Sequence, residues 1–439
     1  MKSGTRNDTV NFKPGPSLRR SVAVAFILAS AGRTGGTQAA AQTTKLAVED
    51  GAFATLLYQE EFVVGARVLA YSLKATGTDR DLVLLCTENI SKQAQAALTS
   101  DGWDVRIVRP IANPGQWTSQ SGGRKGKSFP SKFWAVYTKL YLFNMTEYRK
   151  VVFLDADTLV LQDLEGLFAC PGLCAVTRHA EKVNTGVLVI TPSNKLYQEL
   201  VTAAPVTSSY TGGDQGFLNS FFPAFAAAPM FDPETTAASA IGEPSSLHRL
   251  PTACNADLGL YMIGGHSWTI PRSSIRVMHF TLGPIKPWQW WAAWIADECA
   301  TWQYTRSQLH LRDVSRGITY GKGTRTLAKW VLFPTPVALA GLAMFFRVRT
   351  AKRSTKRDRV PVLGSIDAAG GHAQSKRPGG IQAIAAGFLA VCMGLAVSIA
   401  IIPVGLPAIW GWVLTYEWTL LGVLGCAFAV DENLEDFMS

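Results

Sequence analysis

Short apolar segments alternate with segments of helical spacing through the first part of the chain. Apolar side chains dominate residues 52–58, 81–86, 105–108 and 151–154, as they do in buried strands. Between the first two of these, residues 62–74 place their apolar side chains at helical spacing. Strands that alternate with helices predict an α/β fold, in which helices cover both faces of a mainly parallel sheet.

The last of these apolar segments ends in two carboxylates that are one residue apart. Successive side chains of a strand point to opposite faces, so Asp155 and Asp157 project the same way and Ala156 turns aside. Carboxylate oxygens suit Mn²⁺ or Mg²⁺, and the carboxyl end of a parallel strand is where such sheets bind nucleotides. The segment therefore predicts a divalent-metal site, and the alternative is a solvated turn after a strand.

Three longer apolar segments follow near the end of the chain. Residues 330–346, 381–402 and 408–430 are each long enough, or nearly so, to cross a hydrocarbon core of about 30 Å as helices. We expect three transmembrane helices here. The first is short and contains Pro334 and Pro336, so an interfacial or kinked segment is its alternative.

The beginning of the chain has the order of a secretory signal. Arg19 and Arg20 precede a short apolar run, and small residues follow as far as Ala41. Residues 1–41 are therefore predicted to be a signal peptide or an uncleaved anchor. This places the expected catalytic domain, residues 48–300, in the lumen of the secretory pathway, followed by a juxtamembrane linker at residues 301–329.

The net charge of +10 is concentrated in two segments. Residues 347–379 hold nine basic and two acidic side chains, and residues 1–20 hold five and one, so the remainder is close to neutral. A basic loop beside membrane spans is typical of the cytosolic side, which predicts a cytosolic loop at 347–379 and a cytosolic tail at 431–439. Because no basic stripe with interleaved aromatic residues occurs, nucleic acid is excluded as a partner.

The chain has seven cysteines, and Cys392 and Cys426 fall inside predicted spans. The other five would lie in the oxidising lumen and could form one or two disulfides, whose pairing the spacing leaves open. The spacing of Cys170 and Cys174 also fits half of a zinc site, which we disfavour because no second pair follows.

Further motifs follow the two aspartates in a fixed order: NTGVLVITPS from Asn184, GGDQGFLNSFF from Gly212 and HFTLGPIKPW from His279. Together with AFATLLY, GARVLAYSLK and YTKLYLF upstream, they make residues 52–294 resemble the family-eight glycosyltransferases, the glycogenin-like enzymes. HFTLGPIKPWQWW and LPTACNADLGLY are most similar to the plant-type inositol phosphorylceramide glucuronosyltransferase branch. The resemblance implies a single-domain GT-A fold, a UDP-sugar donor, Mn²⁺ with Mg²⁺ as an alternative, and retention of the anomeric configuration.

The resemblance also implies roles for individual residues. The metal ligands would be Asp155, Asp157 and His279, and the catalytic residues would be Asp214, Gln215 and Lys286. Donor binding would involve Thr55, Leu57, Lys139, Asp155, Ala156, Asp157, Asn184, Thr185, Gly283 and Lys286. Thr211 stands where glycogenins carry an acid, which is compatible with a donor that already bears a carboxylate. The cation that would pair with such a carboxylate stays open among Arg178, Lys182 and Lys132.

These expectations favour a multi-pass membrane glycosyltransferase of the Golgi with a luminal catalytic domain. Its acceptor would be a membrane lipid such as inositol phosphorylceramide, because several spans would fix the catalytic domain close to the bilayer, and its transferred sugar would be glucuronate. The alternatives are a transferase acting on wall glycans or on its own tyrosine, and a catalytically silent UDP-sugar-binding scaffold. The oligomeric state is left open.

Overall fold

The structure is a computed structural model of the whole chain. It describes residues 51–114, 133–178, 182–233, 243–283, 285–318, 320, 328–339, 341–342, 344–345, 380–402, 406 and 408–436. The predicted signal segment, the basic loop at 347–379 and Lys132 lie outside these residues.

A seven-stranded sheet forms the centre of the catalytic part. Its strands, in spatial order, are β3 (Trp103–Ile107), β2 (Asp81–Cys86), β1 (Gly51–Leu57), β4 (Lys150–Leu154), β7 (Val183–Ile190), β6 (Leu173–Thr177) and β8 (Leu247–Leu250). Neighbours are parallel except that β7 is antiparallel to both β4 and β6. The prediction of a mainly parallel α/β sheet is confirmed, with one reversed strand that makes it mixed.

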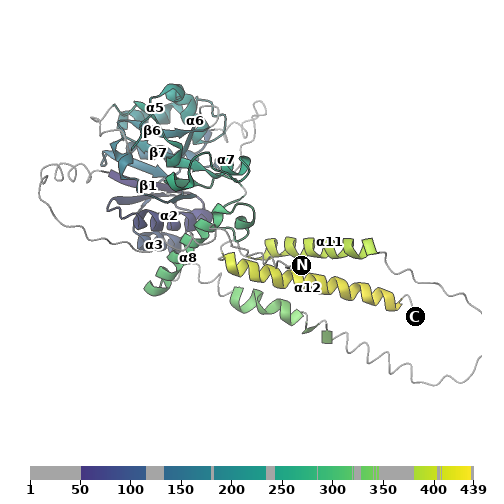
Figure 1. The fold of residues 1–439 in the computed structure, drawn as a ribbon. Coiled ribbons are helices and arrows are strands. Elements are labelled where there is room, and N and C mark those ends of the chain that lie inside the picture. Colours follow the sequence, from purple (N-terminus) through teal and green to yellow (C-terminus); the bar gives the residue numbers. More distant parts are fainter. Residues whose placement is uncertain are drawn as a thin grey trace, which may run out of the picture. The chain divides into compact units, whose positions relative to one another are not determined.

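Helices cover both faces of this sheet, as the alternating pattern predicts. The helices of the catalytic part are α2 (Val63–Ala75), α3 (Lys92–Asp101), α5 (Asn194–Ala203), α6 (Asp214–Phe221), α7 (Leu258–Ile263) and α8 (Glu298–Arg316), and α11 (Gly380–Ile401) and α12 (Ala408–Asp436) follow later in the chain. Figure 1 shows α2 and α3 on one side of the sheet and α5 and α6 on the other. Along β1, Phe53 and Leu57 belong to the core under α2, whereas Ala52 and Ala54 belong to the core under α5 and α6.

Short helical turns connect these elements. The 3₁₀ turns are η2 (Glu60–Phe62), η4 (Val136–Asn144), η5 (Glu165–Ala169), η7 (Pro223–Ala227), η8 (Thr252–Asn255), η9 (Arg272–Ser274) and η10 (Ala292–Trp294), and η11 (Ala328–Leu332) is π-helical.

A second, small sheet lies next to the carboxyl end of β4. It consists of β5 (Thr158–Val160), β10 (Val277–His279) and β9 (Ala256–Asp257). Antiparallel pairing of β10 with β5 sets His279 opposite Thr158, one residue after Asp157. This register brings a residue from far along the chain to the end of the central sheet.

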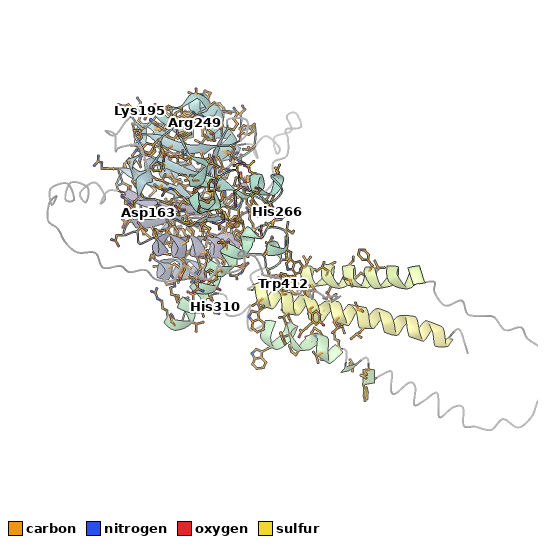
Figure 2. All side chains as sticks on the ribbon, in the orientation of Figure 1. Asp163, Lys195, Arg249, His266, His310 and Trp412 are labelled. Atoms are coloured by element: carbon orange, nitrogen blue, oxygen red, sulfur yellow. A yellow bond between two sulfur atoms is a disulfide. The ribbon has the colours of Figure 1, made fainter. Side chains whose placement is uncertain are left out.

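Helix α8 extends the catalytic unit beyond the predicted boundary at residue 300. Arg67 of α2 bonds Asp101 of α3 and Asp313 of α8, and all three side chains are buried. His310 lies on the same helix (Figure 2). The segment predicted to be a juxtamembrane linker therefore begins as a helix that is held to α2 and α3 by buried charges.

The predicted span 381–402 matches α11 to within one residue, and the predicted span 408–430 lies within α12, which continues to Asp436 in the predicted tail. The two helices pack closely, since a Cβ atom on Gly394 would lie 2.8 Å from the Cα atom of Thr419. In the part of the chain that the structure describes, no helix combines the length and the hydropathy of a membrane span. The three transmembrane helices stay a prediction.

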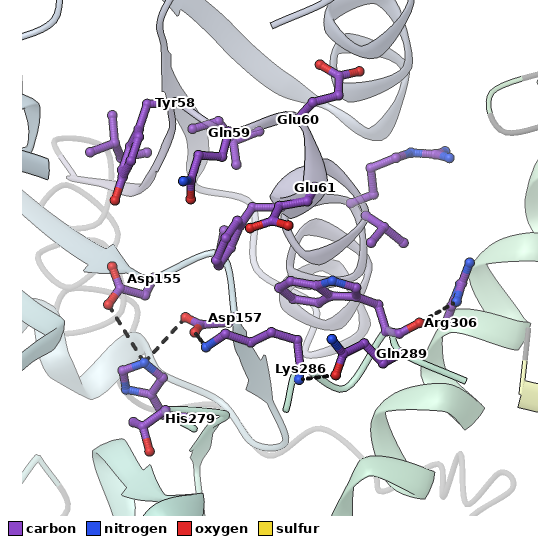
Figure 3. Close-up of a pocket in the computed structure, with 18 of the residues that line it drawn as sticks. Tyr58, Gln59, Glu60, Glu61, Asp155, Asp157, His279, Lys286, Gln289 and Arg306 are labelled. Carbon is purple, nitrogen blue, oxygen red and sulfur yellow. Dashed lines mark hydrogen bonds and ion pairs between the residues drawn. The ribbon is translucent and has the colours of Figure 1, made fainter. Parts of the chain in front are cut away.

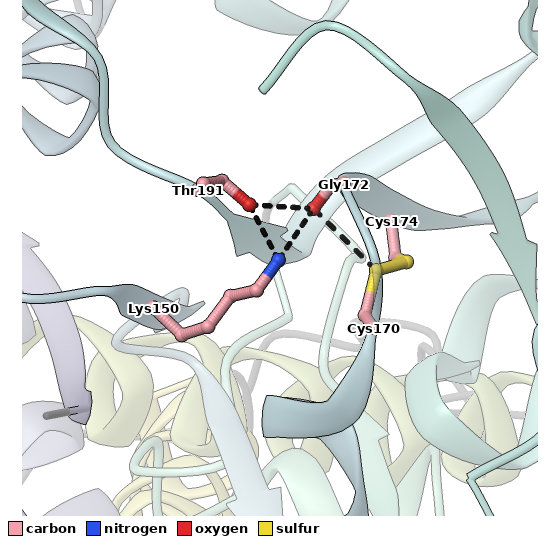
Figure 4. Close-up of a disulfide and its surroundings, with 5 residues drawn as sticks. All are labelled: Lys150, Cys170, Gly172, Cys174 and Thr191. Atoms are coloured by element: carbon pink, nitrogen blue, oxygen red, sulfur yellow. Dashed lines mark hydrogen bonds between the residues drawn. A yellow bond between two sulfur atoms is a disulfide. The ribbon is translucent and has the colours of Figure 1, made fainter. Parts of the chain in front are cut away.

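A disulfide joins Cys170 and Cys174 at the start of β6, which selects one of the pairings that the sequence leaves open. Figure 4 shows Lys150 beside this bridge. The Nζ atom of Lys150 donates to Thr191 Oγ1 and to the carbonyl of Gly172, which lies between the two cysteines. Burial, with a smaller contribution from Arg149, lowers the pKa of Lys150 to about 8.

This lowered pKa predicts a pH-dependent stability. Between the folded pKa of about 8 and the ordinary value of 10.5, the unfolded chain binds more protons than the folded one. We therefore expect the free energy of unfolding to rise with pH across this window, by on the order of 3 kcal/mol in total. Urea unfolding at several pH values should show this rise in the wild type and in Lys195→Met, an exposed control, but not in Lys150→Met. A parallel rise in Lys150→Met would contradict it.

Candidate active site

The three predicted metal ligands meet at the carboxyl end of β4. Asp155 and Asp157 directly follow this strand, and His279 ends β10. The Nε2 atom of His279 lies 3.4 Å from Asp157 Oδ1 and 3.7 Å from Asp155 Oδ2. Figure 3 shows the imidazole nitrogen facing both carboxylates. One ligand atom from each of the three residues lies within 4.8 Å of the others.

This cluster fits a divalent cation. Two carboxylate oxygens and one imidazole nitrogen form a donor set that Mn²⁺ accepts. Burial tends to raise the pKa of Asp157, but Lys286 and His279 lower it below its ordinary value, so this carboxylate is charged. Burial raises the pKa of Asp155, against the opposing effect of Lys139. A cation between the two carboxylates would favour the charged form of both.

Lys139 is a buried cation between two acids. Its side chain is 4% exposed, and its Nζ atom lies 2.7 Å from Asp214 Oδ2 and 3.2 Å from Asp155 Oδ1. Although burial lowers the pKa of Lys139, the two acids raise it above its ordinary value. Thr185 completes this group, since its hydroxyl donates to Asp214 Oδ2 at 2.8 Å. Lys139 is thus part of the site and is not a solvated helix lysine.

Lys286 approaches the metal cluster from the other side. Its Nζ atom lies 2.6 Å from Asp157 Oδ2 and 2.8 Å from the carbonyl oxygen of Phe280. The loop that carries it is braced by Gln289, whose Oε1 accepts from the Lys286 N–H, and by Gln303 of α8, which donates to the carbonyl of Pro287. The site therefore holds one ammonium group on each side of the two aspartates.

A cavity of about 1170 Å³ connects these groups. It is larger than the roughly 300–1,000 Å³ of typical small-molecule sites, which suits a nucleotide sugar together with part of an acceptor. The predicted residues that line it are Leu57, Lys139, Asp155, Ala156, Asp157, Asn184, Thr185, Asp214, Gln215, His279, Gly283 and Lys286.

Thr55 is the predicted donor-binding residue whose side chain lies elsewhere. It is fully buried in β1, and its hydroxyl donates to the carbonyl of Leu154 at 2.7 Å. Its expected role in donor binding is corrected accordingly: the Thr55 side chain does not line the cavity, whereas Leu57 and Tyr58 at the end of β1 do. Thr211, which also lines the cavity, accepts from the N–H of Gly216 and so holds the start of α6.

The candidates for pairing a donor carboxylate differ in position. Arg178 lines the cavity and forms an ion pair with Asp257. Lys182 is exposed and does not line the cavity, and Lys132 lies outside the described residues. Of the two candidates that the structure describes, Arg178 is the one that lines the cavity.

Two residues that contact the metal cluster or the turn between its two aspartates were not predicted as site residues from the sequence. Gly65 of α2 lies against the carbonyl of Ala156, where any side chain would overlap, so the helix can approach the Asp155–Asp157 turn closely. Asn255 contacts His279 through a hydrogen bond. The first residue is part of GARVLAYSLK and the second of LPTACNADLGLY, but neither motif indicates a contact with a metal ligand.

Comparison with known proteins adds to this geometry. The model of glycosyl transferase family 8 matches residues 54–173. Inositol phosphorylceramide glucuronosyltransferase 1 of Arabidopsis thaliana is 36% identical over 394 residues, which cover 84% of this chain and 71% of that protein. Putative UDP-glucuronate:xylan alpha-glucuronosyltransferase 3 of the same plant is 36% identical over 174 residues, and Glycogenin-1 of Caenorhabditis elegans is 32% identical over 244. The matches cover 39% and 55% of this chain, and 26% and 52% of those two relatives.

Solved structures give weaker matches. The galactosyltransferase LgtC, in complex with donor and acceptor sugar analogs, is 18% identical with a TM-score of 0.38 and covers 58% of this chain and 95% of its own. The glycosyltransferase GlyE of Streptococcus pneumoniae is 17% identical with a TM-score of 0.40 and covers 62% and 65%.

The mixed sheet, the acidic cluster at its carboxyl edge and the sequence matches together define a UDP-sugar-dependent glycosyltransferase. The chain belongs to glycosyl transferase family 8.

Proposed function

We propose that this protein transfers glucuronate from UDP-glucuronate to a membrane-lipid acceptor such as inositol phosphorylceramide, with a divalent metal ion as cofactor and Mn²⁺ as the first candidate. Support for the donor and acceptor comes from the Arabidopsis inositol phosphorylceramide glucuronosyltransferase, of which this chain covers 71%. The xylan glucuronosyltransferases carry UDP-glucuronate in their names as well.

One observation carries the catalytic part of this proposal. Asp155, Asp157 and His279 face the same cavity as Lys139 and Lys286. Transfer from a nucleotide sugar leaves a diphosphate whose negative charge grows as the glycosidic bond breaks. A cation site with an ammonium group on each side is the arrangement that this charge requires.

Each residue has a part in this chemistry. Asp155, Asp157 and His279 would hold the metal ion, which supplies positive charge to the diphosphate when it is bound. Lys286 offsets the charge that develops on the departing phosphate. Lys139 holds the Asp214 carboxylate in place through the 2.7 Å ion pair.

Retention of configuration is part of the proposal. The acceptor oxygen bonds to the anomeric carbon on the face from which the phosphate oxygen leaves, and the acceptor proton passes to that phosphate oxygen. Asp214, together with Gln215, then stabilises the positive charge that develops on the sugar. The two acids that follow β4 would bind the metal. They are therefore not the nucleophile and general acid of a glycosidase-type mechanism.

A lipid acceptor fits a protein of the Golgi membrane, and we propose that location with the catalytic domain in the lumen. The support is the order of segments in the sequence: a basic and apolar beginning, a catalytic unit, then apolar segments that flank a basic loop. Transfer to a wall polysaccharide is the second candidate, because two xylan glucuronosyltransferases and three putative ones are 34–37% identical to this chain over 172–174 residues.

A donor and acceptor panel tests this function. Detergent-solubilised full-length protein is incubated with Mn²⁺ and one donor, which is UDP-glucuronate, UDP-glucose, UDP-galactose or UDP-xylose. Each donor is tested with inositol phosphorylceramide, with xylan and without acceptor. We expect UDP release from UDP-glucuronate that increases when inositol phosphorylceramide is added, and a labelled lipid product. Stimulation by xylan alone would support the second candidate. Labelling of the protein itself, without acceptor, would indicate self-modification and contradict both.

A further inference from the structure

A buried chain of amide groups leads from the backbone of β7 to the imidazole of His279. The N–H of Gly186 donates to Asn184 Oδ1 at 2.8 Å, and Asn255 Nδ2 donates to the same oxygen at 3.1 Å. The Oδ1 atom of Asn255 lies 3.0 Å from His279 Nδ1. Asn184, Asn255 and His279 are each less than 5% exposed.

The backbone N–H of Gly186 fixes the direction of every hydrogen bond in this series, which we call the relay. A backbone N–H can only donate, so the atom of Asn184 that faces Gly186 is the carbonyl oxygen. The group of Asn255 that faces this oxygen must then be its NH₂, which leaves its own carbonyl oxygen toward the ring. His279 Nδ1 must therefore carry the proton.

This assignment has a direct consequence for the opposite side of the ring. A neutral imidazole with its proton on Nδ1 has a bare lone pair on Nε2, the atom that faces Asp155 and Asp157. In the other tautomer the lone pair would lie on Nδ1, opposite the lone pairs of the Asn255 carbonyl. The imidazole also packs directly against Gly186, where any side chain would overlap the ring of His279.

We propose that Asn255 is a positioning residue that fixes the metal-binding tautomer and orientation of His279, with Asn184 and Gly186 as its anchor. The inference rests on the metal-dependent activity proposed above, and it gives part of the NTG motif a supporting role besides the expected contact of Asn184 with the sugar. Partners that orient a metal-bound histidine are worth about 10- to 100-fold in metal affinity.

The test measures metal affinity and tautomer rather than turnover. Mn²⁺ binding to the full-length protein is measured by electron paramagnetic resonance for wild type, Asn255→Leu and Asn255→Asp. We expect the dissociation constant to rise about 10- to 100-fold in Asn255→Leu, which removes the acceptor. Asn255→Asp keeps an acceptor for the Nδ1 proton, so its dissociation constant should stay within about threefold of wild type.

Nitrogen-15 spectra of the metal-free, histidine-labelled protein give the second readout, with the His279 signals assigned by their loss in His279→Gln. We expect the Nδ1-protonated tautomer in wild type and Asn255→Asp, and a mixture of tautomers in Asn255→Leu. Asn219→Leu is the matched control. Asn219 is a buried asparagine that bridges β7 and α6 through Val183 and Gln215, so its loss should lower stability without changing Mn²⁺ affinity.

Three outcomes would overturn the relay: an unchanged affinity and tautomer in Asn255→Leu, an equal loss in Asn255→Asp, or an equal loss in Asn219→Leu. An equal loss in Asn255→Asp, which keeps the acceptor facing His279 Nδ1 but loses the donor to Asn184, would mean that this acceptor does not set the metal affinity. An equal loss in Asn219→Leu would mean that Asn255 acts through packing alone. If Asn255→Leu does not fold, Asn255→Ala removes the same amide without adding bulk, and the same measurements decide. Absence of Mn²⁺ binding in the wild type would instead count against the proposed function.

Discussion

Replacement of Asp157 by Asn is expected to lower turnover of the UDP-sugar by about a thousandfold or more. The carboxylate is buried, its pKa lies below the ordinary value, and it contacts both Lys286 and His279. An amide would remove one negative charge from the metal cluster and would leave the Lys286 ammonium without its acid. UDP release at saturating Mn²⁺ and donor is the measurement.

Asp79→Asn is the matched control for this change, because Asp79 is exposed and lies outside the cavity. It should retain wild-type turnover, and thermal unfolding should show that both variants fold. Turnover of Asp157→Asn within tenfold of wild type would exclude the metal cluster as the catalytic centre. If the protein is a scaffold, Asp157→Asn should leave its biological role intact.

Replacement of Arg67 by Met is expected to destabilise the catalytic unit by about 3–5 kcal/mol. The guanidinium lies 2.6 Å from Asp101 Oδ2 and 3.0 Å from Asp313 Oδ1, and Arg312 contacts the same two acids. Burial tends to lower the pKa of Arg67, but Asp101 and Asp313 raise it. Without Arg67, the buried carboxylates of Asp101 and Asp313 would share the single cation of Arg312, and α8 would lose its ion pair with α2.

Urea unfolding, followed by circular dichroism, measures this loss. Arg106→Met is a suitable control, because Arg106 pairs with Asp104 and Glu147 near the surface, where such pairs contribute about 0–1 kcal/mol. Equal destabilisation by both substitutions would mean that the buried ion pairs of Arg67 contribute no more to stability than the surface ion pairs of Arg106. A loss of turnover in Arg67→Met without a change in stability would instead indicate a direct part in the cavity, which Arg67 also lines.

Elements with a local signal were predicted well. The apolar run 81–86 is β2, the run 52–58 is β1 shifted by one residue, and helical spacing at 62–74 is α2 shifted by one. Strands β1 and β2 are buried on both faces, which requires a continuous apolar run, and α2 buries one face, which requires apolar residues at helical spacing. The reversed direction of β7 left no such trace, because a fully buried strand has the same composition in either direction.

The metal cluster and the two lysines follow from the sequence only when local pattern and resemblance are combined. Asp155 and Asp157 can be recognised from their spacing after β4. His279 and Lys286 are more than a hundred residues away, and only their motif connects them to that strand. The role expected for Thr55 came from the resemblance alone, which does not tell which side chains of β1 are buried: the Thr55 side chain is fully buried, and its hydroxyl donates to the carbonyl of Leu154.

By itself, the sequence determined the α/β class, the main strands of the parallel half of the sheet and the acids that follow β4, because each depends on residues that are close along the chain. Only the tertiary structure decided that Asn255 orients His279, that Gly65 permits the approach of α2, and that Arg67 ties α8 to the catalytic unit. These contacts join segments that are distant in sequence. Their energy comes from buried partners meeting at one point in space, which no local period of side chains encodes.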